Sequence, residues 1–392
     1  MPTLFLVVFV NVLGFGLIVP LLPFYVERLG GGPETVTLII ALYSLLQFVT
    51  APVIGRLSDR YGRKPLMAWT MLGTMFGHIL LGMADSLWLV IVSRAILGVM
   101  AGNLGVAYAY ASDITSPDQR AKAIGTLSAA FGMGFMFGPG IGGLLAGVDV
   151  ETANFMLPAF SAASLATIGL ICILTLLPES LKSEDRSDHP DAPQISMLEQ
   201  VKITFKLPSV AMLSVVSFLL YAAWSMLLAI FALWANRVLG HGPREIGFVF
   251  MFMGMIGTFT QLTLIGPLEK RFGELSVIVI TVIAMVIGLL MIASATDLVM
   301  TLIATTVLAT SHSIFTPMVT SVVSKQAAPK ERGTVLGIFQ GVGGLGRVVG
   351  PAFAGFAFAQ IGYTSPYLIG AVILLPCCVL TIMMTRQSKD SH

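Results

Sequence analysis

Long stretches of this chain carry no charged side chain, and this constrains its fold more than any other feature. Such uncharged runs cover, for example, residues 67–84 and 210–236. An apolar run of 18 or more residues is long enough to cross a bilayer as a helix. Only 11% of the 392 residues are charged, whereas a soluble protein carries about a quarter. The sequence therefore predicts an all-α membrane protein.

Apolar runs separated by loops that contain glycine, proline and charges predict twelve transmembrane helices. The expected ranges are 3–26, 35–56, 66–84, 87–111, 121–147, 154–177, 208–236, 245–266, 275–294, 297–323, 333–359 and 364–385. The first run has no charged segment before it and extends for about 24 residues, so we expect a retained helix and not a signal peptide.

The distribution of Lys and Arg predicts how the spans are oriented. Seventeen of the 22 fall in one alternating set of loops together with the tail, three fall in the opposite set, and Arg94 and Arg347 fall within spans. Because cytoplasmic loops are richer in these residues, both termini are expected in the cytoplasm, with the protein in the inner (plasma) membrane. The net charge of +2 argues against nucleic acid as a partner and leaves membrane lipid and a small molecule.

A polar segment at 178–207 separates six predicted spans from six, which predicts a six-helix bundle at 1–177, a cytoplasmic linker, and a second bundle at 208–392. The halves also match each other: residues 55–62 resemble 266–273, and the glycine pattern of 120–139 recurs at 332–351. Such duplication is typical of transporters with a cavity between two repeats. Two six-helix repeats therefore favour a transporter that alternates between two openings.

The loop after the second span reads Gly55-Arg-Leu-Ser-Asp59-Arg60-Tyr-Gly62-Arg63-Lys64. It resembles the cytoplasmic signature of the major facilitator superfamily, specifically the twelve-helix drug:proton antiporter branch that includes the tetracycline efflux proteins. The resemblance covers essentially the whole chain and implies the major facilitator fold. It also implies a conformational latch, formed by Gly55, Asp59, Arg60, Gly62, Arg63 and Asp113, with Asp113 as partner of Arg60 or Arg63. Within it, we expect Gly55 to let helices approach closely and Asp59 to meet a helix N-terminus.

Two further motifs carry the same resemblance. Arg94-Ala-Ile-Leu-Gly98 is similar to the family's buried-arginine motif, which is associated with proton transfer, although a snorkelling arginine near the outer interface is the alternative. The segment 134–143 resembles the motif shared by exporters of this superfamily. Small residues spaced by four permit close helix contact and a proline permits a kink; the exporter motif comprises Gly134, Gly138, Pro139, Gly142 and Gly143.

The first span departs from the family pattern, because Asn11 stands where related proton antiporters often have Asp. Asn cannot carry a proton at physiological pH. None of the 20 acidic residues lies deep within a predicted span. His312 and His78 are the other titratable candidates. The tenth helix lines the cavity in this superfamily, so the resemblance favours His312 over His78, with packing as the alternative for each histidine. The predicted proton-coupling residues are therefore His312 and Arg94.

Arg347 lies near the middle of the eleventh predicted span, where an unpaired cation is costly. Three environments would stabilise the charge of Arg347: a hydrated cavity, the carbonyl groups at a helix C-terminus, or a negative group supplied by the cargo. Arg94, Arg347 and His312 without an embedded carboxylate would make a cavity electropositive, which favours an anionic or zwitterionic cargo. The predicted cargo-binding residues are Asn11, Gln47, Asn103, Tyr221, Trp224, Gln261, Gln340 and Arg347.

We therefore expect a monomeric secondary active exporter of small amphipathic compounds, coupled to protons, that works by alternating access without a cofactor or metal. An enzyme is disfavoured, since the chain lacks the phosphate-loop, HExxH and GxSxG patterns. A sensor would need a further soluble domain, which about 30 linker residues do not supply. An uptake symporter or an exchanger of an organic anion remains the alternative, because Asn11 replaces a carboxylate.

Overall fold

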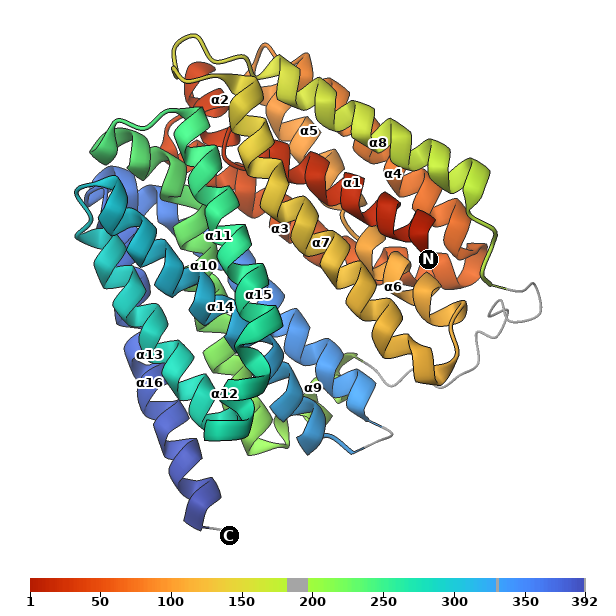
Figure 1. Ribbon diagram of the computed structural model, residues 1–392, viewed down its shortest axis with the longest axis vertical. Helices are drawn as coiled ribbons and strands as arrows, with labels where there is room; N and C mark the ends of the chain where they lie inside the picture. Colours follow the sequence, from red (N-terminus) through yellow and green to blue (C-terminus); the bar gives the residue numbers. More distant parts are fainter. Residues whose placement is uncertain (182–196, 329–330, 391–392) are drawn as a thin grey trace. The chain divides into compact units, whose positions relative to one another are not determined.

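The computed structural model describes residues 1–181, 197–328 and 331–390, and these residues form sixteen α-helices (Figure 1). Among them, eleven helices or continuous helix pairs are long and apolar enough to cross a membrane, and up to twelve when the bent pair α1–α2 counts as one span. The predicted all-α fold with twelve spans is confirmed. The chain is a multi-pass membrane protein.

The helices divide into two compact units. The N-unit contains α1 (Pro2–Ile18), α2 (Leu22–Arg28), α3 (Pro33–Tyr61), α4 (Arg63–Gly82), α5 (Leu87–Met100), α6 (Asn103–Asp113), α7 (Pro117–Ala146) and α8 (Met156–Leu176). The C-unit contains α9 (Met197–Phe205), α10 (Pro208–Leu239), α12 (Ile265–Phe272), α13 (Glu274–Ala293), α14 (Leu298–Gln326), α15 (Arg332–Gln360) and α16 (Ser365–Asp390). Helix α11 (Pro243–Thr263) belongs to the N-unit through Gly254 and to the C-unit from Met255.

Three predicted spans are interrupted. The first bends by 43° between α1 and α2, where Pro20 lacks the amide needed to continue the helix. The fourth is divided into α5 and α6 at Ala101–Gly102, and the eighth continues past Leu264 into α12. Hydropathy alone did not reveal these breaks, because the residues on both sides of each break are apolar.

The predicted linker at 178–207 contains a helix that the sequence analysis did not foresee. Residues 182–196 lie outside the described part of the chain, but Met197–Phe205 forms α9, which packs against α10 and α15. Thr204 is fully buried in this contact region. Because Ser, Asp and Pro residues before Met197 dominate the composition of the segment, its average polarity gave no indication of the short amphipathic helix that follows them.

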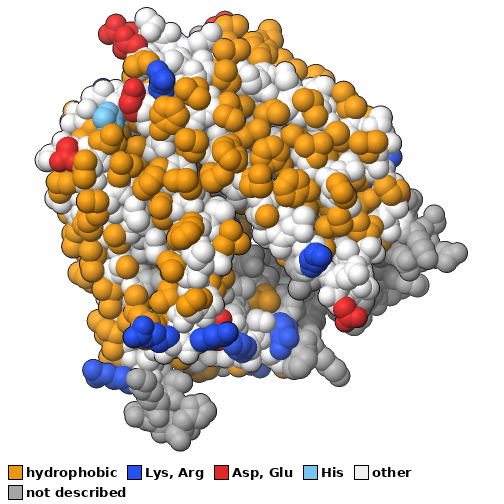
Figure 2. Space-filling model, in the orientation of Figure 1, with side chains coloured by type: hydrophobic (Ala, Val, Ile, Leu, Met, Phe, Trp, Pro, Cys, Tyr) orange, Lys and Arg blue, Asp and Glu red, His pale blue; other side chains and the backbone are white. Residues whose placement is uncertain are grey.

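Large apolar side chains point outward from the C-unit, as expected for helices that face lipid. On the face drawn in Figure 2, hydrophobic side chains cover the flank of this unit, and Lys and Arg gather at the end where Figure 1 places α12. The exposed apolar residues include Ile280, Ile283, Ile287 and Leu290 of α13 and Val372, Leu375 and Val379 of α16.

Glycines bring one helix pair into close contact in each unit. In the N-unit, a Cβ added at Gly138 of α7 would lie 2.7 Å from the Cα of Gly16 in α1. In the C-unit, a Cβ at Gly350 of α15 would collide with the carbonyl oxygen of Ala222 in α10. Gly350 follows Gly138 by the repeat offset noted in the sequence, so the duplicated glycines make the same kind of contact in both units.

We predict that Gly138→Ala destabilises the protein by about 1–3 kcal/mol, because its methyl group would meet backbone atoms that move only if the two helices separate. Gly125→Ala is the matched control: it lies on the same helix, and nothing lies within 4 Å of an added Cβ. Since alanine favours a helix over glycine by about 1 kcal/mol, this control should be neutral or stabilising. Thermal unfolding in detergent measures both; equal effects would refute the packing account.

Candidate functional site

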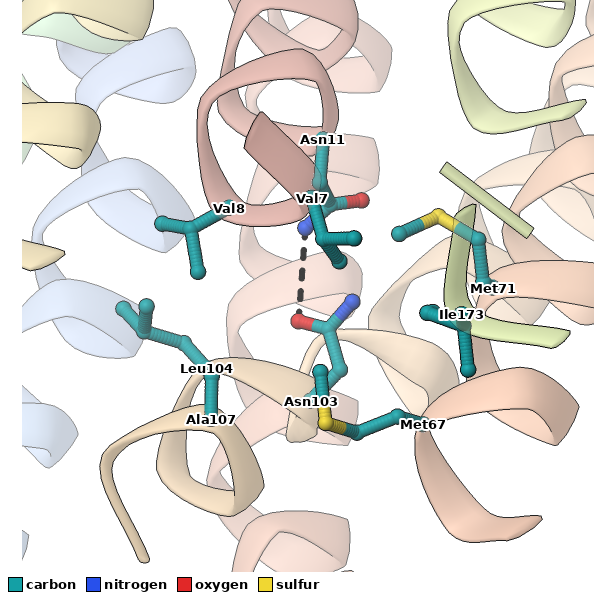
Figure 3. A pocket seen from close by; sticks show the side chains of 9 residues that line it. All are labelled: Val7, Val8, Asn11, Met67, Met71, Asn103, Leu104, Ala107 and Ile173. Carbon is teal, nitrogen blue, oxygen red and sulfur yellow. Dashed lines mark hydrogen bonds between the residues drawn. The ribbon is translucent and has the colours of Figure 1, made fainter. Parts of the chain in front are cut away.

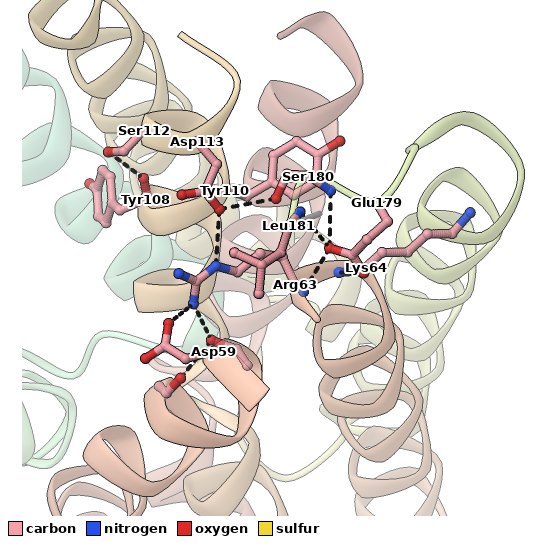
Figure 4. Close-up of polar contacts among 12 residues, drawn as sticks. Asp59, Arg63, Lys64, Tyr108, Tyr110, Ser112, Asp113, Glu179, Ser180 and Leu181 are labelled. Atoms are coloured by element: carbon pink, nitrogen blue, oxygen red, sulfur yellow. Dashed lines mark hydrogen bonds and ion pairs between the residues drawn. The ribbon is translucent and has the colours of Figure 1, made fainter. Parts of the chain in front are cut away.

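The predicted latch is centred on Arg63, whose guanidinium joins α3, α4 and α6 (Figure 4). Its Nη1 lies 2.5 Å from Asp59 Oδ1 and donates to Ser58 Oγ at 2.6 Å, while its Nε donates to Asp113 Oδ2 at 3.1 Å. The expected partner of Asp113 is thus Arg63. Arg60 instead lies over the ring of Tyr61, at 5.5 Å from the centroid.

The first turn of α4 is capped by Glu179, a residue that the sequence analysis missed. Its Oε1 accepts a hydrogen bond from the backbone N of Arg63 at 2.9 Å, and its Oε2 accepts one from that of Lys64 at 3.3 Å. The N-cap residue is Gly62, which offers no side chain and has a φ of 104°. A carboxylate at a helix N-terminus satisfies free amides and interacts favourably with the helix dipole.

Two latch expectations need correction. No described atom lies within 4 Å of a Cβ built on Gly55, so the close helix approach expected at this glycine is absent from the structure. Asp59 pairs with Arg63 four residues along the chain, and the helix N-terminus that it was expected to meet is held here by Glu179. The missed signal was the uncapped Gly62-Arg63 start of α4, whose partner is more than a hundred residues away in sequence.

The C-unit has a related junction with the charges reversed. Gly273, with a φ of 77°, precedes Glu274 at the start of α13. The carboxylate of Glu274 pairs with Lys325 Nζ at 2.9 Å and accepts a hydrogen bond from Ser321 Oγ. In the N-unit the cation, Arg63, begins the helix that follows the glycine, and its anionic partner lies further along the chain. In the C-unit the anion, Glu274, begins that helix, and its cationic partner lies further along the chain.

Asn11 and Asn103, two predicted cargo-binding residues, face each other in the N-unit (Figure 3). Asn11 Nδ2 donates to Asn103 Oδ1 at 3.3 Å, and both line a cavity of about 10 Å³. This volume is sufficient for about one water molecule, whereas a drug-sized ligand needs about 300 Å³ or more. The third predicted cargo residue of this unit, Gln47, does not line the cavity.

Arg94 is buried in the N-unit with 3% of its surface exposed, which is inconsistent with a side chain that snorkels to the interface. Its Nε and Nη2 atoms have no hydrogen-bond partner among the described residues, and neither does Nδ1 of the equally buried His78. Tyr43 and His78 lie within electrostatic range of the guanidinium. A buried guanidinium without an acid partner is costly and is typical of a functional position.

The C-unit brings four of the predicted residues into one cluster, which we call the C-unit cluster: Tyr221, Trp224, His312 and Arg347. Arg347 Cζ lies 5.3 Å from the centroid of the Tyr221 ring, a cation–π contact. The His312 ring stacks on Trp224 at 4.2 Å and 12°, and it meets Tyr221 edge-on at 5.8 Å and 77°. Arg347 is exposed, so its charge is accessible to a ligand.

Local packing fixes this cluster. A Cβ at Gly343 would lie 2.9 Å from the Tyr221 ring, and one at Gly346 would collide with the carbonyl oxygen of Phe218. The Tyr221 hydroxyl donates to Thr316 Oγ1 at 3.1 Å, which in turn donates to the carbonyl oxygen of His312 at 3.3 Å.

Thr316 was missed, although it lies one helical turn after His312 and therefore on the same helix face. Gln261 and Gln340 are exposed, and among the described residues no hydrogen bond or ring contact joins them to the C-unit cluster.

The exporter motif has two packing faces on α7. Gly134, Gly138 and Gly142 face α1, as described for Gly138. On the other face, a Cβ at Gly143 would lie 2.6 Å from the carbonyl oxygen of Pro243 in α11, and one at Gly247 of α11 would lie 2.5 Å from that of Pro139. The motif therefore joins α1, α7 and the first part of α11 within the N-unit.

We predict that Glu179→Ala lowers the free energy of unfolding by about 1–2 kcal/mol, the usual effect of losing a helix cap. Glu151→Ala is the control, because Glu151 lies in the exposed loop between α7 and α8 and caps no helix. Thermal unfolding of the two variants should differ by several degrees, and an unchanged unfolding temperature for Glu179→Ala would contradict the capping role.

Comparison with known proteins identifies the family. The Major Facilitator Superfamily model matches residues 4–264 and 213–392. The chain is 26% identical to Multidrug resistance protein 2 of Bacillus subtilis, over 98% of this chain and 94% of that protein. It is 28% identical to the class C tetracycline resistance protein of Escherichia coli, over 94% and 92% of the two chains.

The fold is also found among solved structures. The human organic anion transporter MFSD10 has a TM-score of 0.72 at 22% identity, covering 97% of this chain and 98% of that one. These matches confirm the predicted resemblance to tetracycline and multidrug efflux proteins. They also confirm the prediction that the protein is a transporter and not an enzyme. The chain belongs to the Major Facilitator Superfamily.

Proposed function

We propose that this transporter exports small amphipathic compounds that carry a negative charge, either as anions or as zwitterions. The observation that carries the proposal is the C-unit cluster, where the accessible Arg347 lies over Tyr221 beside Trp224 and His312. Relatives that match nearly the whole chain are named for multidrug and tetracycline resistance, which supports export over uptake.

The charge of the cluster favours a negative group on the cargo. Helices α10, α14 and α15 contain no Asp or Glu anywhere along their length. A cation within a membrane protein is stabilised by an anion or by water, so Arg347 offers a binding site for a carboxylate or enolate of the cargo. The aromatic rings of Tyr221 and Trp224 supply an apolar surface, while Asn11, Gln47, Asn103, Gln261 and Gln340 stay predictions as further contacts.

Proton coupling is assigned in this proposal to His312 and Arg94. Arg94 is buried and His312 is half-buried, and each has buried nitrogen atoms without a hydrogen-bond partner among the described residues, His312 through Nε2 and Arg94 through Nε and Nη2. An unpartnered imidazole nitrogen can gain a proton without breaking a hydrogen bond within the protein. Export would then use the inward proton gradient.

The proposed transporter works by alternating access. The latch around Arg63 and the exporter motif control the change between its two openings. The excess of Lys and Arg in one set of loops supports cytoplasmic termini in the inner membrane. A monomer is the simplest functional unit, because two six-helix repeats of one chain suffice for the fold.

Uptake symport or exchange of an organic anion is the second candidate. It is favoured by the lack of acidic residues on α10, α14 and α15, because an anion bound at Arg347 neutralises that cation and thereby favours a proton beside it. The direction of transport with an imposed pH gradient distinguishes the two candidates.

We predict that Arg347→Ala lowers the apparent affinity for a transported anionic or zwitterionic compound by about 10–100-fold, the usual loss when a charged hydrogen bond is removed. Arg332→Ala, an exposed arginine at the start of the same helix, is the control. Transport into inverted vesicles measures both variants, and full transport by Arg347→Ala would contradict the proposed cargo site.

We also predict that His312→Gln abolishes uptake driven by a pH gradient in proteoliposomes and leaves exchange of unlabelled for labelled cargo intact. The amide keeps polarity and approximate size but cannot titrate. His241→Gln, in the loop between α10 and α11, is the control. If the pH-driven rate is unchanged in His312→Gln, this histidine does not carry the coupled proton.

A further inference from the structure

One exposed face of α11 and α12 changes from apolar to basic along its length. Phe259 and Leu262 of α11 are 61% and 81% exposed. Gly266 and Lys270 follow Leu262 by four and eight residues, and both are exposed. Because side chains four residues apart lie on the same side of a helix, this face presents large apolar groups and, about 12 Å further along, a cation.

The helical register is kept across the break at Leu264, so the face is continuous. The backbone N of Leu264 donates to the carbonyl oxygen of Thr260 at 2.9 Å, and the backbone N of Leu268 donates to that of Leu264 at 3.1 Å. No described atom lies within 4 Å of a Cβ built on Gly266, between the apolar and the basic parts. A ligand could therefore lie along both parts without meeting a side chain at this glycine.

The basic end of the face consists of Lys270 and Arg271. Both are exposed, and neither side chain forms an ion pair or a hydrogen bond among the described residues. Arg271 lies over the ring of Phe272 at 5.3 Å, and this ring is 44% exposed. The adjacent acid, Glu269, is half-buried and lies within electrostatic range of Lys325. The basic end thus offers two exposed cations and part of an aromatic ring.

The two repeats differ in how they use the first of these positions. At the repeat offset, Lys270 stands in place of Asp59 and Glu274 in place of Arg63. Asp59 pairs with Arg63 in the N-unit, whereas Glu274 pairs with Lys325, and among the described residues no ion pair joins it to Lys270. Lys270 therefore has no part in the junction of the C-unit, and its charge is available to a ligand.

The chemistry of the face identifies the class of ligand. Exposed apolar side chains on a membrane helix contact acyl chains, and basic side chains at the end of a span attract anionic headgroups. In Figure 2, the Lys and Arg side chains at the end where Figure 1 places α12 lie below an apolar flank. A soluble anion would not use Phe259 and Leu262, and a lipid without net charge would not neutralise Lys270 and Arg271.

We propose that this face of the C-unit binds an anionic phospholipid, with the phosphate at Lys270 and Arg271 and an acyl chain along Leu262 and Phe259. The inference goes beyond the proposed function, because the site lies outside the C-unit cluster and does not depend on the nature of the cargo. It assigns a specific lipid site to one of the two units.

Native mass spectrometry of the purified protein in a non-ionic detergent tests the site by counting bound lipids. Phosphatidylglycerol should bind about tenfold more tightly than phosphatidylcholine with the same acyl chains. The double variant Lys270→Gln, Arg271→Gln should bind phosphatidylglycerol about 25-fold more weakly, because each basic side chain near an anionic lipid contributes about fivefold. The matched control is Arg120→Gln, Lys122→Gln, which removes two exposed cations from the N-unit and should leave the affinity unchanged.

Further variants separate the charge from the apolar contact, and the unfolding temperature of each variant shows that it is folded. Lys270→Arg with Arg271→Lys keeps both charges and should retain binding. Leu262→Ser should weaken binding of long-chain phosphatidylglycerol and leave a short-chain form unaffected. The inference would be overturned by unchanged affinity in the folded Lys270→Gln, Arg271→Gln variant or by an equal loss in the N-unit control. Displacement of the lipid by millimolar inorganic phosphate would also overturn it, because it would indicate a site for a soluble anion.

Discussion

The contact between α10 and α15 is the interaction on which the functional account depends. Gly343 and Gly346 let α15 approach the backbone of α10 and the Tyr221 ring, and this approach places the adjacent Arg347 over that ring. A larger residue at either glycine would separate the helices and remove the aromatic support of the guanidinium. Close packing of small residues, which drives helix association in membranes, here also positions a charge.

The sequence was sufficient to predict the spans and the members of the C-unit cluster. Uncharged length determines which segments cross the bilayer, and Arg347 and His312 were identifiable because polar residues are rare and costly there. Glu179 and Thr316 were missed for a different reason. Glu179 caps a helix from a distant part of the chain, and Thr316 acts through the hydroxyl of Tyr221, so both roles depend on tertiary contacts that local spacing does not encode.

The two units share an ancestral pattern but use it with different charges. A glycine with positive φ begins both α4 and α13, yet Arg63 pairs with Asp113 in one unit and Glu274 pairs with Lys325 in the other. The predicted cargo residues also differ between units: Asn11 and Asn103 share a water-sized cavity, whereas the C-unit cluster holds the accessible cation. Duplication thus preserved the packing while the charged and aromatic groups diverged.

The central claim is that small amphipathic compounds with a negative charge bind at Arg347 beside Trp224, and tryptophan fluorescence tests this most directly. Trp69→Phe and Trp88→Phe remove two exposed tryptophans and leave Trp224 with the fully buried Trp234. The account predicts saturable quenching by the zwitterion para-(aminomethyl)benzoate that disappears in the added Arg347→Ala variant. Quenching that is unchanged by Arg347→Ala, or that is equally strong with the cation para-methylbenzylamine, would contradict it.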